Sequence, residues 1–321
     1  MISGFSTPYT KISMTSKIPS VQVPVPAAQI PSVPPVVLPV PRIPVPSLQS
    51  RYSRYSCTMT FTMGDSGENH VGMATVGTRA QAGQGFTLQD MQRIQSQCAS
   101  LSGVRCQIHH LNSLYAAGSG GSGLPAGAPP PEDAYLAVIS GFLDTKAADD
   151  IFTEQNALSW DSKYWDSRRK KVLNKHARRN LIYDVQASSA DYANKQGTVI
   201  GWNSVPKLAG AHTTISNLVG PKASNLICEG NLYYDPTKTG IGWHGDTERV
   251  KVIGLRIGAT LPLCYRWWYK SKSFGKTLTL SLNHGDIYIM SEKAVGNDWK
   301  KRNTVTLRHS AGSAKYTDVN K

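Results

Sequence analysis

The C-terminal part of the chain alternates apolar and polar residues in short runs, and this pattern predicts β-strands. The runs are separated by Gly, Pro, Asn or Lys residues of the kind that form turns. A succession of short strands with few helices between them favours a sandwich or a barrel. The strands expected in this part of the chain cover residues 226–234, 250–261, 263–269, 276–282, 286–290 and 304–309.

Helices are expected only ahead of these strands. Thr87-Leu-Gln-Asp90 resembles a capping box with Asp in the position of Glu, and apolar residues then recur at helical spacing. The pattern therefore predicts an amphipathic helix over residues 88–101. A second helix is predicted over residues 145–158, after a strand-like run at 135–143. Residues 55–63 alternate weakly and give one more candidate strand.

Two stretches interrupt these patterns. Residues 18–48 hold ten of the nineteen prolines, which favour an extended polyproline II conformation. Their Val and Ile residues indicate a strap along a protein partner, with a disordered tail as the alternative. The second stretch, at residues 116–133, is rich in Gly, Ser and Pro, a composition that indicates a linker. The predicted organisation is a Pro/Val-rich arm and weakly structured segment at 1–86, a short helical region at 87–115, the linker at 116–133 and a folded domain at 134–321.

These elements together predict a fold class. The chain is expected to be mostly β with flanking helices, an α+β protein. The C-terminal domain fits a double-stranded β-helix, or jelly roll, and a Pro-rich, largely extended N-terminal region precedes it.

Charge and cysteine content indicate which partners and which cellular compartment to expect. The formal net charge is +14, of which residues 1–133 contribute +3 and residues 134–321 contribute +11. Such an excess favours a polyanionic partner such as nucleic acid. The five cysteines form no regular framework, which indicates a reducing compartment rather than secretion. No apolar run is long enough to span a membrane and no signal peptide is recognisable, so we expect an intracellular protein of cytoplasm or nucleus, or one associated with a virus particle.

A basic cluster in the C-terminal domain is the candidate surface for nucleic acid. Cations contact phosphates and aromatic rings stack on bases, and Tyr164, Trp165 and Tyr183 lie around this cluster. A solvated basic face is the alternative interpretation. The cluster consists of Arg168, Arg169, Lys170, Lys171, Lys175, Arg178 and Arg179.

The candidate chemistry is centred on His244-Gly-Asp246. An imidazole and a carboxylate two residues apart share one face of a strand and can contribute two ligands of a facial triad that holds non-haem Fe(II). Arg302 and Arg308 lie six residues apart, an even spacing that would place both guanidinium groups on one strand face, where they could bind a dicarboxylate. Asn231 and Tyr233 could donate further hydrogen bonds.

The order of these motifs resembles the AlkB-like family of Fe(II)/2-oxoglutarate-dependent dioxygenases, in particular the versions found in large DNA viruses of algae and amoebae and in some protists. The resemblance covers about residues 134–317 and does not extend to the first 130. The phrases that carry it are NKHARRNL (174–181), EGNLYYD (229–235), GIGWHGDTERVKVIGLRIG (240–258), NHGDIYIMSEKAVGNDWKKR (283–302) and TLRHSAG (306–312).

The resemblance implies oxidative demethylation of alkylated nucleic acid or, in some members, of protein. Fe(II) and 2-oxoglutarate are the cofactors it implies, and an N-methyl group leaves as formaldehyde. His244 and Asp246 correspond to iron ligands in the catalytic centre. Four further residues correspond to the 2-oxoglutarate site, namely Asn231, Tyr233, Arg302 and Arg308. The segment around His176–Tyr183 corresponds to the part that lies over the substrate, where the basic cluster would guide a nucleic-acid strand.

The third iron ligand departs from the family pattern. The family has a histidine between the Gly-Asp strand and the first arginine, whereas residues 287–301 contain none. His309 and Asp298 are the two candidates, and a site with two ligands or without metal is the remaining possibility. His309 would face outward if Arg308 pointed into the barrel, because neighbours on a strand point to opposite faces.

A second class of function is a structural or particle-associated protein. In that interpretation the N-terminal arm threads along neighbouring subunits, while a dioxygenase-like domain with reduced or no catalysis faces nucleic acid. A nucleic-acid-binding module that retains the fold without the chemistry is a third possibility. Glu248 and Arg249, directly after the motif, are candidates for a pair beside the metal or the substrate.

Overall fold

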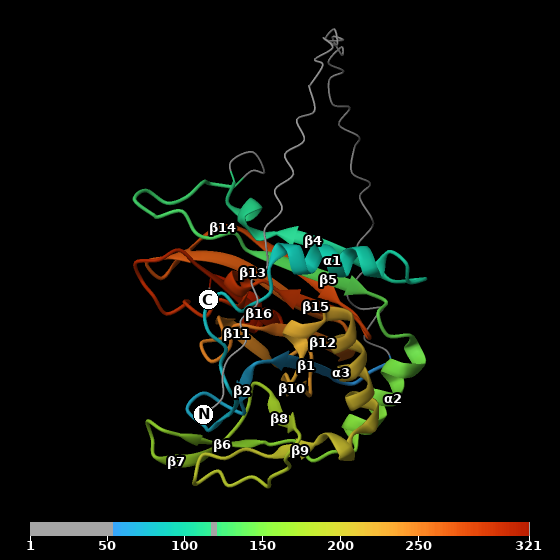
Figure 1. Cartoon of the computed structure of the whole chain (residues 1–321). Coiled ribbons are helices and arrows are strands. Elements are labelled where there is room, and N and C mark those ends of the chain that lie inside the picture. The colour runs from blue at the N-terminus through green and yellow to red at the C-terminus, as the bar shows by residue number, and fades with distance from the viewer. Residues whose placement is uncertain (1–53, 117–120, 321) are drawn as a thin grey trace, which may run out of the picture. The chain divides into compact units, whose positions relative to one another are not determined.

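The computed structural model describes residues 54–116 and 121–320, and its largest element is an eight-stranded sheet (Figure 1). The strand order is β4-β5-β15-β12-β1-β10-β8-β9, and all neighbours are antiparallel except β8 and β9. The strands are β1 (Thr58–Gly64), β4 (Arg105–His110), β5 (Tyr135–Ser140), β8 (Arg179–Asp184), β9 (Val199–Gly201), β10 (Ile227–Tyr233), β12 (Val252–Gly258) and β15 (Ile287–Met290).

Strand β1 illustrates how sequence determines the two faces of this sheet. Met59, Phe61 and Met63 belong to an apolar core shared with the helices, while the threonines between them point to the opposite face. The same alternation continues on β10, where Glu229, Asn231 and Tyr233 line a cavity. One face of the sheet is therefore apolar and covered by helices, and the other carries polar groups.

Three helices pack on the apolar face, namely α1 (Leu88–Cys98), α2 (Thr145–Asn156) and α3 (Pro206–Val219). The predicted capping box of α1 is confirmed, because Thr87 accepts from the backbone of Asp90 and the Asp90 side chain accepts from the backbone of Thr87. Helix α2 is capped by Asp144. Helix α3 was not predicted from the pattern, and it buries Leu208, Ala211, Ile215 and Val219.

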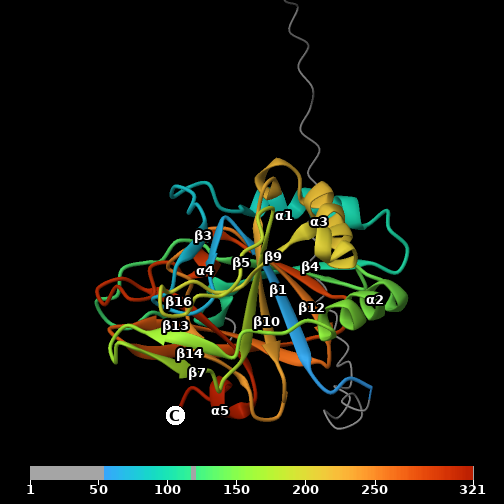
Figure 2. The same ribbon diagram turned by 90° about the horizontal axis from the view of Figure 1, so that it is seen from below.

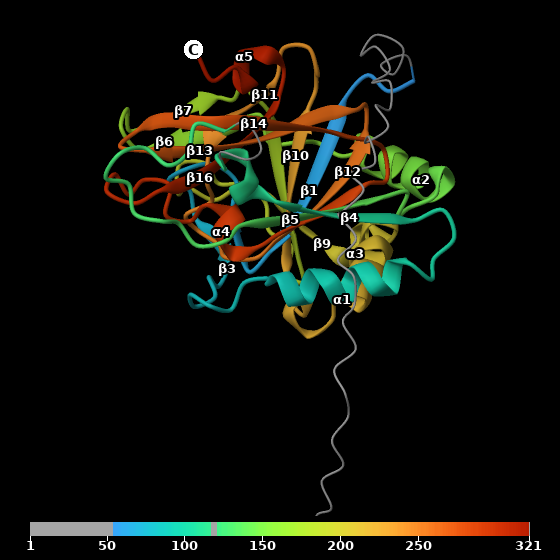
Figure 3. The same cartoon turned by 90° about the horizontal axis from the view of Figure 1, so that it is seen from above.

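A second, four-stranded antiparallel sheet packs against the other face. Its order is β11-β16-β13-β14, and Figures 2 and 3 show it on the side of the large sheet opposite to the helices. A second apolar core, which includes Leu136 and Tyr288 from one sheet and Trp267 and Leu307 from the other, joins the two sheets. The strands are β11 (Gly240–His244), β13 (Leu261–Tyr269), β14 (Lys272–Leu282) and β16 (Thr306–Gly312).

The remaining elements are short. Two hairpins stand apart from the main sheets, one formed by β2 (Ser66–Glu68) and β3 (Thr75–Gly77), the other by β6 (Lys163–Asp166) and β7 (Lys171–Asn174). Two four-residue helices, α4 (Glu292–Val295) and α5 (Ala314–Thr317), flank β16. Short 3-10 turns cover Leu111–Leu114, Trp202–Ser204 and Pro221–Ala223.

The structure confirms a mostly β chain with flanking helices. Each strand expected after residue 225 is present with bounds shifted by a few residues, and β11 is an additional strand that the pattern did not predict. All five cysteines are free. Among the described helices, none combines the length and the apolar character needed to cross a membrane.

The predicted division at residues 116–133 is wrong as a domain boundary. The described residues 54–116 and 121–320 belong to one compact unit, and β1, from the segment before the division, lies between β12 and β10 in the middle of the large sheet. Strand β4 likewise pairs with β5 across it. The Gly- and Pro-rich composition therefore marks a loop within one fold. The predicted arm at residues 18–48 lies outside the described residues.

Candidate metal centre

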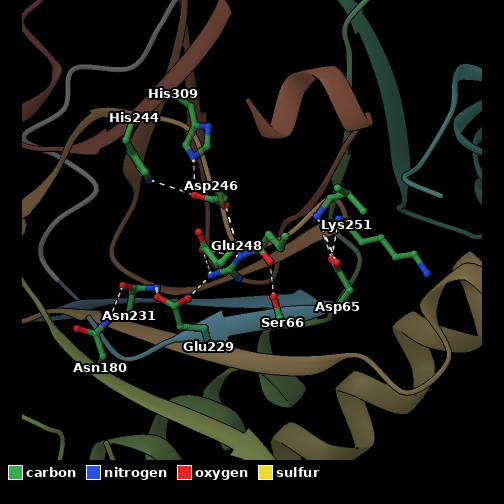
Figure 4. Close-up of polar contacts among 12 residues, drawn as sticks. Asp65, Ser66, Asn180, Glu229, Asn231, His244, Asp246, Glu248, Lys251 and His309 are labelled. Atoms are coloured by element: carbon green, nitrogen blue, oxygen red, sulfur yellow. Dashed lines mark hydrogen bonds and ion pairs between the residues drawn. The ribbon is translucent and has the colours of Figure 1, made fainter. Parts of the chain in front are cut away.

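The structure brings His244, Asp246 and His309 together at one point, with one ligand atom from each lying within 4.8 Å of the others (Figure 4). The Asp246 Oδ1 atom lies 3.4 Å from His244 Nε2 and 3.7 Å from His309 Nε2. Strands β11 and β16 are antiparallel and pair His244 directly with His309. We call these three residues the His–Asp–His cluster.

Asp246 reaches the cluster from a loop rather than from a strand. Strand β11 ends at His244, and the backbone N–H of Asp246 donates to Val295 O at 3.0 Å. A Cβ at Gly245 would lie 2.1 Å from Gly296 O, so only glycine permits this approach of the loop to the end of α4. The glycine of the His-Gly-Asp motif is thus required by packing.

The protonation states of the cluster suit metal binding. The Nδ1 of His244 lies 2.7 Å from Gly242 O, a contact that fixes the proton on Nδ1 and leaves Nε2 free to ligate. Burial, reinforced by His244, lowers the pKa of His309. Burial alone would raise the pKa of Asp246, but Arg249 and the two histidines hold it well below the usual range.

The cluster fits a divalent metal ion such as Fe(II). Ligand atoms about 2.1 Å from an ion and at right angles to each other lie about 3 Å apart, so the observed spacings require only small adjustments. Two imidazoles and one carboxylate are the donor set of the facial triad. Of the two candidates for the third position, the structure brings His309 into the cluster and leaves Asp298 outside it, where Asp298 pairs with Lys293 at 2.6 Å.

The predicted arrangement of Arg302 and Arg308 is wrong. Strand β16 begins at Thr306, so Arg302 lies in the preceding turn and is exposed. Arg308 points away from the cavity, and its guanidinium carbon lies 4.9 Å from the ring of Trp268 and 5.2 Å from that of Trp299. Since neighbours on a strand alternate, this outward orientation of Arg308 is what places His309 inward.

Asn231 and Tyr233 both line the cavity beside the His–Asp–His cluster. The Asn231 side chain is fully engaged, because its Oδ1 accepts from Arg178 and Asn180 while its Nδ2 donates to Glu229. Tyr233 is 3% exposed. Asn231 therefore organises the wall of the cavity, whereas Tyr233 presents its side chain to the interior.

Arg249 connects the cluster to a buried acidic group. Its guanidinium pairs with Glu229 and Glu248 and lies 3.7 Å from Asp246 Oδ2. The expected pair of Glu248 and Arg249 is thus present, and Glu229 is a further partner that the sequence did not indicate. The arginine orients the carboxylate of Asp246, as the outer partners of metal ligands do.

Arg256 is a second buried arginine to which the sequence pattern assigned no role. It lies on β12 and lines the same cavity, which has a volume of about 420 Å³. A single arginine in the otherwise apolar run Val252–Gly258 was the signal that could have identified it.

The predicted basic cluster divides into three groups. Arg168, Arg169 and Lys170 occupy the exposed turn between β6 and β7, and Lys171 opens β7. Lys175 points inward, and its Nζ donates to oxygens of Asn69 and Asn180, so its inclusion in a nucleic-acid surface is wrong.

The two remaining arginines, Arg178 and Arg179, lie outside the β6–β7 hairpin and differ from each other in exposure. Arg178 lines the cavity and donates to Asn231. Arg179 is exposed and lies over the ring of Tyr234. The members of the cluster that remain exposed to a polyanion are therefore the residues of the β6–β7 turn, Lys171 and Arg179.

Comparison with other proteins gives a relative without a stated activity. The chain matches no protein-family profile. Over 264 residues it is 38% identical to a protein of Acanthamoeba polyphaga mimivirus named "Uncharacterized protein R156". The match covers 81% of this chain and 97% of the relative.

Proposed function

The chain belongs to the same family as protein R156 of Acanthamoeba polyphaga mimivirus, and we propose that it is an Fe(II)- and 2-oxoglutarate-dependent dioxygenase. The observation that carries this proposal is the convergence of His244, Asp246 and His309 on one point of a cavity. This donor set leaves part of the coordination sphere of an iron ion free for a co-substrate and O2.

The fold proposed for this activity is a double-stranded β-helix, or jelly roll. Two facing, largely antiparallel sheets with a shared apolar core support it. Strands β11 and β16 of the smaller sheet carry the two histidines, and β10 and β12 of the larger sheet form the opposite wall of the cavity. An interior site between two rigid sheets holds ligands in fixed geometry.

The residues of this chain would hold and shield the reacting groups. His244, Asp246 and His309 would bind Fe(II), with Arg249 orienting the Asp246 carboxylate. Bound together, Fe(II) and 2-oxoglutarate would supply an oxidation in which one oxygen atom of O2 enters succinate with release of CO2 and the other hydroxylates an N-methyl group, which leaves as formaldehyde. Tyr233 and Tyr288 would line the dry part of the cavity.

Alkylated nucleic acid is the proposed substrate class. His70 lines the cavity and stacks on Tyr164 of β6 with ring centroids 3.7 Å apart. The basic turn of the β6–β7 hairpin follows the strand that carries this stack. Phosphates near the turn and a base near the aromatic pair would suit the two kinds of contact.

Metal binding and turnover test the proposal together. We expect the wild-type protein with Fe(II), 2-oxoglutarate and O2 to form succinate. His244→Ala and His309→Ala each remove one ligand, so both should lose Fe(II) binding and succinate formation. Calorimetric titration with Fe(II) under anaerobic conditions and quantification of succinate check these outcomes.

Two controls make the test specific. His176→Ala removes a histidine that is not part of the cluster, and Asp298→Asn neutralises the competing carboxylate, so both should retain Fe(II). Loss of Fe(II) in Asp298→Asn but not in His309→Ala would contradict the assigned ligands. A wild-type protein that binds no Fe(II) would overturn the proposal in favour of a structural or nucleic-acid-binding protein.

A further inference from the structure

Arg256 is a buried cation with two guanidinium nitrogens that have no hydrogen-bond partner within the described part of the chain. The residue is 1% exposed, and neither Nε nor Nη1 has a hydrogen-bond partner there. Burial of a guanidinium is strongly unfavourable unless hydrogen bonds and an opposite charge compensate for the lost water. The position therefore requires an acceptor that the described residues do not provide.

No acidic side chain of the described residues forms an ion pair with Arg256. The nearest carboxylate in the electrostatic surroundings is that of Asp286. Its two oxygens accept from the backbone N–H groups of Asn283 at 2.8 Å and of Gly141 at 3.1 Å, so this carboxylate is committed to the turn before β15. Of the other acidic residues of the cavity, Glu229, Asp246 and Glu248 pair with Arg249, and Glu68 forms no ion pair with Arg256 among the described residues.

The groups around Arg256 suit a carboxylate. Thr60, its direct neighbour across the β1–β12 pair, has a buried hydroxyl without a partner in the described residues. Tyr233 and Tyr288 are within electrostatic range of the guanidinium. A Cβ at Gly254 would lie 2.0 Å from the ring of Tyr288, so glycine makes the room that this ring occupies above β12.

Arg256 and the His–Asp–His cluster line the same cavity. Tyr233 and Tyr288 also line this cavity, and each interacts electrostatically with both Arg256 and Asp246. An anion held by Arg256 would therefore extend along the tyrosines toward the metal ligands. A small molecule with a charged group at each end matches this arrangement.

We propose that Arg256, flanked by Tyr233 and Tyr288, binds the distal carboxylate of a dicarboxylic 2-oxo acid whose oxo-acid end faces the His–Asp–His cluster. The assignment rests on the proposed function and replaces Arg302 and Arg308, neither of which lines the cavity. It places the anchor on β12, in the wall of the large sheet, instead of on the last strand. Arg forks bind carboxylates through two parallel hydrogen bonds, which gives selectivity for the dicarboxylic ligand.

Binding measurements without turnover test this assignment. With Mn(II) in place of Fe(II), calorimetry compares 2-oxoglutarate with 2-oxopentanoate, which has a methyl group instead of the distal carboxylate. The wild-type protein should prefer 2-oxoglutarate by about 100-fold, and Arg256→Gln should remove that preference while 2-oxopentanoate affinity stays within about threefold. Arg308→Gln, the same substitution outside the cavity, should leave both affinities unchanged.

Two further measurements distinguish a failure of the Arg256 assignment from a failure of the proposed function. Mn(II) binding by the wild-type protein is measured first, and its absence contradicts the metal site. Glutarate, which lacks the oxo group, tests the anchor without metal, because it should raise the Tm of the metal-free wild-type protein but not that of Arg256→Gln. Arg256→Lys, which keeps the charge, is the second variant if Arg256→Gln does not fold, and it should weaken 2-oxoglutarate binding about tenfold.

Three results would overturn the assignment. These are a wild-type protein with no preference for 2-oxoglutarate, an Arg256→Gln protein that retains the preference, and an Arg308→Gln protein that loses it. Succinate formation by the wild-type protein would leave the proposed function intact in each of these cases.

Discussion

The pKa of Glu68 reflects the crowding of acidic side chains at the cavity. Burial raises the pKa of its carboxyl to about 7, and the neighbouring carboxylates of Glu248 and Glu229 contribute further. Arg249 offsets only part of this because it already pairs with both of those residues. In the metal-free protein, Glu68 therefore carries a proton that it would not carry in the unfolded chain.

This protonation makes the stability of the metal-free protein depend on pH. Between the ordinary value of about 4.5 and about 7, the folded state binds a proton that the unfolded state has released, so stability falls as the pH rises through this window. Glu68→Gln mimics the protonated form. It should raise the free energy of unfolding by about 1 kcal/mol more at pH 8 than at pH 5, a figure reduced because the side chain is partly exposed to screening solvent.

Urea unfolding of the metal-free protein at the two pH values checks this expectation. Glu132→Gln, a substitution at an exposed position, is the matched control and should show no such difference. An equal effect of Glu68→Gln at both pH values would mean that its carboxyl ionises normally in the folded state.

At the scale of elements, the cluster depends on the approach of the β11 loop to the end of α4. Gly245→Ala would place a methyl group 2.1 Å from Gly296 O, a contact between two backbone segments that cannot be relieved by a side-chain rotation. The loop that carries Asp246 must then move. We expect Mn(II) affinity to fall at least tenfold and the Tm to fall by several degrees, because the Asp246 N–H loses its bond to Val295 O.

Gly242→Ala is the control within the same strand, because an added Cβ there meets nothing within 4 Å. Calorimetric titration with Mn(II) and thermal unfolding compare the two variants. Equal metal affinities would show that the loop tolerates a side chain and that Asp246 can reach the cluster along another path.

The elements that the sequence predicted are those with a local cause. The alternation on β1 and the capping box of α1 were visible because each depends on neighbouring residues. Helix α3 was not predicted, since it contains Gly210 and the β-branched Thr213 and Thr214, which favour helix weakly. Its formation follows from the burial of one apolar face on the large sheet, which is a tertiary effect.

The same distinction between local and tertiary causes explains which site residues could be predicted from the sequence. His244 and Asp246 converge as predicted, but Asp246 does so from the loop after β11 and not along a shared strand face. Spacing along one strand also does not reveal which of its faces points inward. The register of β16 against β11 decides that His309 faces the cavity and Arg308 does not. Arg256 could be interpreted only once the residues that might neutralise it were known to be engaged elsewhere.

At the scale of the whole molecule, residues 54–116 and residues 121–320 both contribute strands to one sheet. Strand β1 pairs with β10 and β12 over its whole length, so the cavity wall is assembled from segments almost 200 residues apart in sequence. The β6–β7 hairpin stands outside this sheet and adds charge without contributing a strand to it. Substitutions in its turn can therefore change binding while the fold remains intact.

That separation allows a test of the proposed nucleic-acid surface. Arg168→Ala, Arg169→Ala and Lys171→Ala combined remove three exposed charges from the hairpin, and Lys170 is left in place because its φ of 50° disfavours substitution. A control combines Arg105→Ala, Lys146→Ala and Lys272→Ala, exposed residues of β4, α2 and β14. Both variants lose the same net charge, so a nonspecific effect of charge would weaken binding equally.

If the hairpin residues contact phosphates directly, the two variants should differ. Each phosphate contact to a single strand contributes about 0.7 to the slope of log affinity against log salt concentration, so the hairpin variant should lower that slope by about 2 and the affinity at least tenfold. The control variant should stay close to the wild type. Fluorescence anisotropy with single-stranded DNA and RNA of one sequence, at several salt concentrations, measures both quantities. Equal slopes for the two variants would place the polyanion elsewhere on the molecule, whereas a loss confined to the hairpin variant would place it beside the His70–Tyr164 stack at the cavity.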